Sequence, residues 1–199
     1  MVFQRMPLEE WFDKYQFEAE YDIGESGVEV QTFQSIGVDL KDLQLRYGYH
    51  AGKPELRQLI AEGYEDLSED NIAVTTGASE ANFAIVASLV EGNDHMIVEH
   101  PNYPSNYEVP RSLDRETDLL TLSFDEGFKP NLKKLEGLIK DDTRLISLTH
   151  PNNPTGSTIS KKMLEELIRI AESKDIYLVL DETYRELSED APPPAATLS

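Results

Sequence analysis

Hydrophobic and polar positions follow two different periods from about residue 53 onward. Four segments repeat apolar residues every three or four positions, as helices with one buried face do, and they begin near Pro54, Ala78, Leu132 and Ser160. Five short runs rich in apolar and β-branched residues predict strands at 71–76, 95–100, 118–124, 143–150 and 176–180. This alternation is typical of βαβ units, so the sequence predicts an α/β fold with a mostly parallel central sheet.

The two ends of the chain fit this alternation poorly. Residues 1–50 suggest a short helix and an irregular arm, and the last nine residues, APPPAATLS, are proline-rich. We therefore predict an N-terminal arm over 1–50 and a large α/β domain over 51–199. Because a parallel sheet would need further strands, we expect this domain to be truncated.

The composition is strongly acidic. The 199 residues include 18 Lys and Arg against 38 Asp and Glu, a formal charge of −20, which argues against nucleic-acid binding. Cysteine is absent, which excludes disulfides, zinc-thiolate sites and thiol nucleophiles. The longest apolar run, 83–90, is too short to cross a bilayer, and the acidic start differs from a signal peptide. We expect a cytoplasmic protein with no membrane partner.

Two nucleotide-binding motifs and a metal site are set aside. The segment Gly48–Pro54 is one residue shorter than a P-loop and has proline where a magnesium-binding Ser or Thr would stand. No GxGxxG motif follows a predicted strand. His95 and His100 lie on opposite faces of one predicted strand and cannot bind the same ion, so we expect no metal site.

Two loops that follow predicted strands carry candidate ligand-binding residues. Ligands of open parallel sheets bind at the carboxyl ends of the strands. Gly77, Ala78 and Ser79 begin a helix whose free N–H groups can bind a phosphate, although an ordinary serine cap explains them equally well. Tyr103 lies between two prolines, where its ring can stack on a planar ligand or pack under the loop.

Two later loops add polar groups. Asn153, in the segment PNNPTG, offers an amide to a ligand oxygen or simply forms part of a turn. Asp181 follows the last predicted strand, where it can pair with a protonated ring nitrogen or cap a helix. Together the four loops provide a phosphate site, a stacking ring, a partner for a phenolic oxygen and a counter-ion for a ring nitrogen. Pyridoxal 5′-phosphate requires this set.

With these loops, the chain resembles the class I and II aminotransferases, which are fold-type I pyridoxal-phosphate enzymes. The segments PNNPTG and DETY carry the resemblance, which extends from about Tyr47 to the end of the chain. It implies a three-layer α/β/α large domain, and it places the start of a small-domain region within residues 1–50. The implied cofactor is pyridoxal 5′-phosphate and the implied assembly is a homodimer.

The resemblance also implies roles for the residues of the first two loops. Gly77, Ala78 and Ser79 would bind the cofactor phosphate, and Tyr103 would stack on the pyridine ring. Tyr47 is similar to the tyrosine that reaches the phosphate bound by the neighbouring subunit.

Further roles follow for the later loops and for the arm. Asn153 and Tyr184 would bind the 3-hydroxyl oxygen of the cofactor, and Asp181 would pair with the pyridinium nitrogen. Ser26 and Gly27 are similar to the segment that lines the substrate.

Three features of the family are not found in the sequence, and one of them is an arginine near the cofactor phosphate. The Schiff-base lysine lies in a Ser-x-Ser-Lys-like segment, and the arginine that binds the substrate carboxylate comes from a C-terminal small domain. No lysine in the sequence is a good substitute: Lys161, Lys162 and Lys174 belong to a predicted exposed helix, and Lys53 begins another. We therefore expect no catalytic residue in this chain and no activity from it alone.

The expected reaction of the complete enzyme is transfer of an amino group between an amino acid and a 2-keto acid. A lyase, cyclase or decarboxylase of the same fold is an alternative, because the same cofactor site supports those reactions. A non-catalytic domain that retains the cofactor site is a third possibility.

Overall fold

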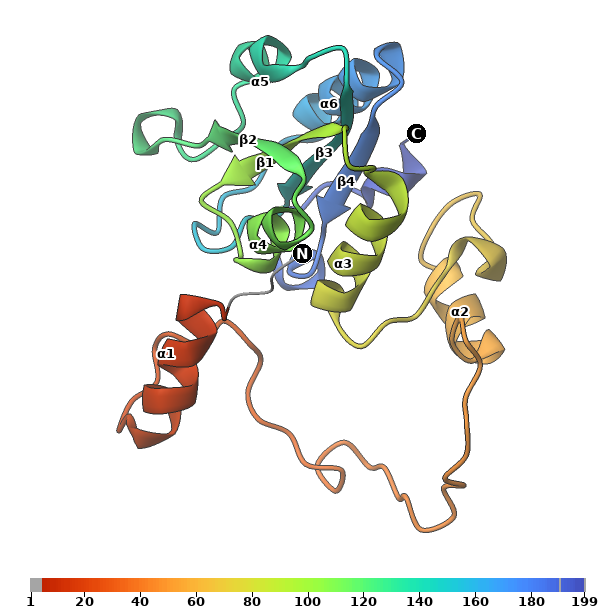
Figure 1. Ribbon diagram of the computed structural model, residues 1–199. Coiled ribbons are helices and arrows are strands. Elements are labelled where there is room, and N and C mark those ends of the chain that lie inside the picture. The colour runs from red at the N-terminus through yellow and green to blue at the C-terminus, as the bar shows by residue number, and fades with distance from the viewer. Residues whose placement is uncertain (1–4, 190, 199) are drawn as a thin grey trace.

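Four parallel strands form the centre of the molecule (Figure 1). The computed structural model describes residues 5–189 and 191–198. The strands are β1 (His95–His100), β2 (Glu116–Thr121), β3 (Thr143–Thr149) and β4 (Tyr177–Asp181), arranged in the order β2-β1-β3-β4. Each neighbouring pair is parallel, which confirms the predicted α/β fold.

Helices cover both faces of this sheet (Figure 1). α3 (Ala78–Leu89) and α4 (Ser105–Ser112) pack on one face, and α5 (Leu132–Leu138) and α6 (Lys161–Ser173) pack on the other. Successive strand residues point to opposite faces, so Met96 and Val98 join the α3 and α4 side whereas Ile97 joins the α5 and α6 side. The predicted three-layer α/β/α arrangement is therefore confirmed.

α6 shows how the sequence positions a helix. Ser160 is its N-cap, and the Ser160 hydroxyl accepts a hydrogen bond from the Met163 backbone N–H at 3.2 Å. Leu164, Leu167 and Ile168 are buried against the sheet, as their spacing predicts. The Ser160 cap thus fixes the start of the helix, and the burial of its apolar stripe holds the helix against the sheet.

Removal of this cap has an expected cost. We expect Ser160→Ala to lower the free energy of unfolding by about 1 kcal/mol, because one N–H of the first turn loses its acceptor. Ser173→Ala is the matched control, since Ser173 lies in the last turn and only donates to the Ile170 carbonyl. Urea denaturation of both variants checks this, and equal effects of the two substitutions would contradict it.

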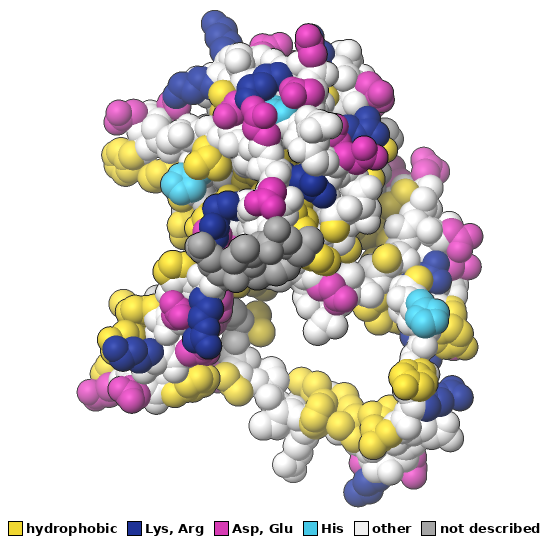
Figure 2. Space-filling model, in the orientation of Figure 1, with side chains coloured by type: hydrophobic (Ala, Val, Ile, Leu, Met, Phe, Trp, Pro, Cys, Tyr) yellow, Lys and Arg dark blue, Asp and Glu magenta, His cyan; other side chains and the backbone are white. Residues whose placement is uncertain are grey.

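The N-terminal arm lies largely outside the layered body. It contains α1 (Pro7–Tyr15) and is followed by α2 (Pro54–Ala61). Residues 17–51 are all exposed, and Gly52 is the first half-buried residue after them. Figure 1 shows the arm as a wide excursion, and Figure 2 shows an open gap between it and the body, with hydrophobic side chains gathered along it. The boundary at residue 50 stays a prediction.

Two segments differ from the sequence-based expectation. Residues 71–76 do not form the predicted strand: a 3₁₀ turn (Glu69–Asn71) is followed by irregular backbone. The Val74 N–H donates to the Ala51 carbonyl, a loop residue, and this single bond does not continue into a ladder. β-branched residues favour a strand only where a neighbouring strand accepts their backbone groups.

α4 is the second difference, because the sequence pattern of residues 105–112 predicts no helix. Pro110 lies inside α4, and a proline removes one helical N–H donor. Pro110 is the sixth of the eight residues of α4, so the helix forms without the N–H bond that this position would otherwise donate. The strand predicted at 118–124 is observed as β2 over Glu116–Thr121. It ends before Phe124 because Phe124–Glu126 form a 3₁₀ turn and cannot extend the strand.

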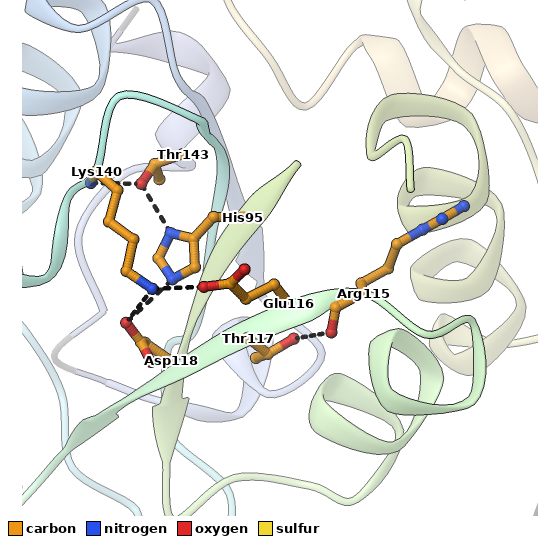
Figure 3. Close-up of polar contacts among 7 residues, drawn as sticks. All are labelled: His95, Arg115, Glu116, Thr117, Asp118, Lys140 and Thr143. Carbon is orange, nitrogen blue, oxygen red and sulfur yellow. Dashed lines mark hydrogen bonds and ion pairs between the residues drawn. The ribbon is translucent and has the colours of Figure 1, made fainter. Parts of the chain in front are cut away.

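A polar cluster ties the amino ends of the strands together (Figure 3). His95 is fully buried; its Nδ1 lies 2.8 Å from the Thr143 hydroxyl, and its Nε2 lies 3.2 Å from the Asp118 carboxylate. Lys140 Nζ lies 3.0 Å from the same carboxylate and 2.8 Å from that of Glu116. Hydrogen bonds and charge attraction from Lys140 lower the pKa of both acids. His95 therefore has a packing and hydrogen-bonding role here.

Candidate functional site

The carboxyl ends of the four parallel strands lie along one edge of the sheet, and the chain changes its direction across the sheet between β1 and β3. β2 lies on one side of β1, and β3 with β4 lies on the other, so the ends of β1 and β3 form a topological switch point. Open parallel sheets bind ligands in the crevice outside such a point. The loops after β1, β3 and β4 begin there, and they are the loops that carry the predicted site residues.

The loop after β3 is a compact turn that presents Asn153. The Asn152 side-chain oxygen accepts hydrogen bonds from the Thr155 N–H at 3.2 Å and the Thr155 hydroxyl at 2.7 Å. Gly156 has φ +67°, a left-handed conformation that glycine adopts without strain. The motif residues around Asn153 therefore hold its backbone in a fixed turn.

Asn153 and Tyr184 lie together beside a cavity. The Asn153 amide donates to the Tyr184 hydroxyl at 3.3 Å, and that hydroxyl is 2.6 Å from the Ser26 hydroxyl of the arm. The cavity of about 330 Å³ is lined by all three residues. The structure thus brings together the two residues predicted to bind one ligand oxygen, and it adds the predicted substrate-lining Ser26.

Asp181 is the last residue of β4 rather than the residue after it. The Thr183 N–H and hydroxyl donate to Oδ1 at 3.2 and 2.6 Å. Asn82 of α3 and Asn106 of α4 donate side-chain amides to Oδ2 at 3.3 and 3.5 Å. All these donors are neutral, and no ion pair joins Asp181 to a Lys or Arg in the described part of the chain. The carboxylate is oriented but keeps its charge available to a cationic ligand.

Tyr103 lies between α1 and the start of α3. Its hydroxyl donates to the Glu9 carboxylate at 2.6 Å. Burial, and then the Glu9 carboxylate, raise the pKa of Tyr103 to about 12, while a hydrogen bond with Ser79 acts in the opposite direction. The phenol is therefore neutral at physiological pH, and its ring lies next to the predicted phosphate-binding turn.

The predicted phosphate-binding turn is the start of α3. Gly77 is its N-cap with φ +81°, and it has no side chain to cap the helix. Ala78 and Ser79 are the first two helical residues. The first backbone N–H groups of a helix lack intrahelical acceptors and favour anions, so this turn can hold a phosphate.

Two predicted site residues, Tyr47 and Gly27, are not among those that line the cavity beside Asn153 and Tyr184. Tyr47 is fully exposed in the arm, and Gly27 donates its N–H to the Glu25 carboxylate at 2.7 Å. The structure describes one chain, so the predicted contact of Tyr47 with a neighbouring subunit stays a prediction. The roles assigned to the other site residues are likewise predictions, although their proximity is observed.

Four polar residues of the site were missed by the sequence analysis: Glu9, Asn82, Glu99 and Asn106. Two of them carry a recognisable signal. Asn82 stands four positions before the buried Val86 and is itself buried, so it is a polar residue on an apolar helix face. Glu99 interrupts the apolar strand HMIVEH and is 1% exposed. An acid inside a buried strand requires polar partners, which the site supplies.

The model of the family "Aminotransferase class I and II" matches residues 28–199. The chain belongs to this family. Its members are pyridoxal-phosphate enzymes, which agrees with a site that offers a helix start, a tyrosine ring and an uncompensated carboxylate.

Individual relatives support the assignment to class I and II. The chain is 33% identical to the aspartate aminotransferase of Pyrococcus horikoshii over 151 residues, which cover 73% of this chain and 39% of that protein. It is 29% identical to the capreomycidine synthase of Streptomyces vinaceus over 94% of this chain and 50% of that protein. A solved pyridoxal-phosphate-dependent aminotransferase of Streptococcus suis superposes with a TM-score of 0.91 and 32% identity, covering 100% of this chain and 56% of that one. The chain therefore spans about half the length of these relatives or less.

Two other kinds of site find no support among the described residues. No group of three or more His, Cys, Asp or Glu side chains there could hold a metal ion. No helix in the same residues has the length and apolar character needed to cross a bilayer.

Proposed function

We propose that this chain forms the cofactor-binding part of a pyridoxal-phosphate-dependent aminotransferase that moves an amino group between an amino acid and a 2-keto acid. The observation that carries the proposal is the Asp181 carboxylate, held only by neutral donors and followed three residues later by Tyr184, which bonds with Asn153. The names of the aminotransferase relatives support the same reaction class.

The residues present fit the cofactor. The start of α3, with Gly77, Ala78 and Ser79, offers N–H groups to a phosphate, and the neutral Tyr103 offers a ring face. Across the site, an amide and a phenol offer hydrogen bonds to a ligand oxygen. When bound, the cofactor withdraws electron density from the Cα of the substrate.

Asp181 has the central chemical role in this proposal. An anion beside a ring nitrogen stabilises the protonated form of that nitrogen. The amides of Asn82 and Asn106 fix the direction of the carboxylate without neutralising it. Asp181 would thereby hold a proton at the ring nitrogen of the bound cofactor.

We further propose that the active protein is a homodimer and that the present lysines do not serve the cofactor. Exposed hydrophobic residues along the arm, among them Ile23, Val30, Leu45 and Tyr47, support a partner surface there. Lys53, Lys161, Lys162 and Lys174 are exposed and belong to α6 or flank a helix. The 199-residue chain alone is therefore expected to show no amino-group transfer.

Product analysis tests the reaction class. A longer polypeptide that carries this chain and the lysine segment of the family is incubated with amino acids, with and without a 2-keto acid. We expect one new amino acid to form for each keto acid consumed, and no turnover without the acceptor. Release of ammonia or carbon dioxide without an acceptor would contradict the proposal.

A second candidate has a specific observation in its favour. The similarity to capreomycidine synthase covers 94% of this chain, including most of the arm, and that protein is named a synthase. A synthase or lyase reaction on the same cofactor is therefore the alternative, and the acceptor-free incubation separates the two.

A further inference from the structure

Glu99 occupies the switch point of the sheet. It is the penultimate residue of β1, the strand between β2 and β3, and it is 1% exposed. Buried acids are rare and need hydrogen-bonding partners. The position of Glu99 is therefore informative, because the loops of the proposed cofactor site begin at the ends of β1 and β3.

Three N–H donors converge on one oxygen of Glu99. Oε1 accepts from the Thr149 backbone N–H at 2.6 Å, from the Asn152 amide at 2.9 Å and from the Asn102 amide at 3.5 Å. Asn152 belongs to the loop after β3 and Asn102 to the loop after β1. A single carboxyl oxygen thus joins the loop that presents Asn153 to the loop that presents Tyr103.

The same network continues to Asp181. Asn102 Oδ1 accepts from the Tyr103 N–H at 2.7 Å and from the Asn106 amide at 3.3 Å. The Asn106 amide also donates to Asp181 Oδ2 at 3.5 Å. Two asparagine side chains therefore connect the carboxyl groups of Glu99 and Asp181.

The pKa of Glu99 lies close to physiological pH. Burial raises its pKa to about 7, the negative charge of Asp181 contributes in the same direction, and the bonds from Thr149 and Asn152 oppose the rise. Burial lowers the pKa of the nearby His150, which follows β3, and Tyr103 has a pKa of about 12, so both are neutral near pH 7. Asp181 is thus the charged group that acts on Glu99 at this edge.

We infer that Glu99 is a positioning residue for the proposed cofactor site: it fixes the Tyr103 and Asn153 loops against each other and is coupled to Asp181 through Asn102 and Asn106. This inference rests on the proposed function. Glu99 touches no reacting atom and acts through the loops and through the charge it places near Asp181.

Amide chemical shifts of the 199-residue chain test the coupling. We expect the Thr149 N–H and the Asn152 side-chain amide to shift with pH, with a midpoint near the pKa of about 7. Glu99→Gln should abolish this titration, because the amide keeps an acceptor oxygen but cannot ionise. Asp181→Asn should lower the midpoint, because the negative charge that opposes ionisation is removed.

A matched control completes this test. Glu136 is exposed on α5, so Glu136→Gln removes the same charge away from the network and should leave the titration unchanged. A titration that persists in Glu99→Gln, or a midpoint that Asp181→Asn does not move, would overturn the coupling.

Ligand affinity tests the positioning role. Calorimetric titration uses pyridoxamine 5′-phosphate, which has no aldehyde and cannot react with surface lysines. We expect Glu99→Ala to weaken binding about tenfold or more, as the loss of anchoring hydrogen bonds implies. At pH 6, Glu99→Gln should restore binding to within about threefold of the unmodified chain, because its oxygen still accepts the N–H donors.

The two proposals fail in different ways. If the unmodified chain does not bind the ligand, the proposed function is contradicted, while the amide titration still decides the coupling to Asp181. If the chain binds and Glu99→Ala binds equally well, the positioning role is overturned. If Glu99→Ala does not fold, the affinity of Glu99→Gln for the ligand at pH 6 is the deciding measurement. A loss of affinity above threefold would overturn the positioning role of Glu99.

Discussion

Asp181→Ala is expected to weaken the binding of pyridoxamine 5′-phosphate by about 30-fold or more, since removal of one partner of a hydrogen-bonded charge pair costs about 2 kcal/mol or more. In the proposed complex the carboxylate pairs with the protonated ring nitrogen. The substitution also leaves the amides of Asn82 and Asn106 without their shared acceptor. Calorimetry gives the fold-change directly.

Two companion variants separate charge from structure. Asp181→Asn keeps an acceptor oxygen and loses the charge, so its affinity should fall between those of the unmodified chain and Asp181→Ala. Asp141 is exposed next to the amino end of β3, and Asp141→Ala should leave the affinity unchanged. Binding by Asp181→Ala within threefold of the unmodified chain would contradict the role of this carboxylate.

Leu164→Ala is expected to lower the free energy of unfolding by about 3 kcal/mol, in the range found for large-to-small changes in packed cores. Leu164 is fully buried between α6 and the sheet, in a cluster that includes Ile97 and Ile146. Its truncation removes apolar contacts and leaves a cavity that the rigid sheet cannot close.

A surface leucine is the control for this substitution. Leu59 of α2 is 65% exposed, so Leu59→Ala should change the free energy of unfolding by less than about 0.5 kcal/mol. Urea denaturation of both variants provides the comparison. A loss below about 1 kcal/mol for Leu164→Ala would show that the α6 layer is not packed as described.

The layered body could be predicted from the sequence because its signals are local. The 160–171 segment places a cap and four apolar residues at helical spacing, and both are observed. The run HMIVEH is a strand over the predicted residues. In each case the side chains that define the pattern are also those that are buried, so the local preference and the tertiary packing agree.

The two wrong predictions of secondary structure concern segments whose conformation depends on tertiary contacts. The run NIAVTT has the composition of a strand, but its observed backbone bond goes to Ala51 in a loop. α4 was missed because Pro101 and Pro104, just before it, indicate a loop, whereas Asn106 and Val109 of this helix are buried against the body. Local propensity alone resolves neither case.

The site residues divide in the same way. Asn153, Asp181 and Tyr184 were identifiable because they belong to motifs and follow strands. Glu99 and Asn106 belong to no motif, and their importance comes from contacts between segments that lie far apart in the sequence. Such contacts become visible only when the positions of β1, β3, β4 and α4 in space are known.

The most direct test of the central claim is a crystal structure of this chain with pyridoxamine 5′-phosphate. The account predicts the phosphate at the start of α3, the ring against Tyr103 and the ring nitrogen within hydrogen-bonding distance of Asp181. A ligand bound elsewhere at saturating concentration, or a ring nitrogen that faces away from Asp181, would contradict it.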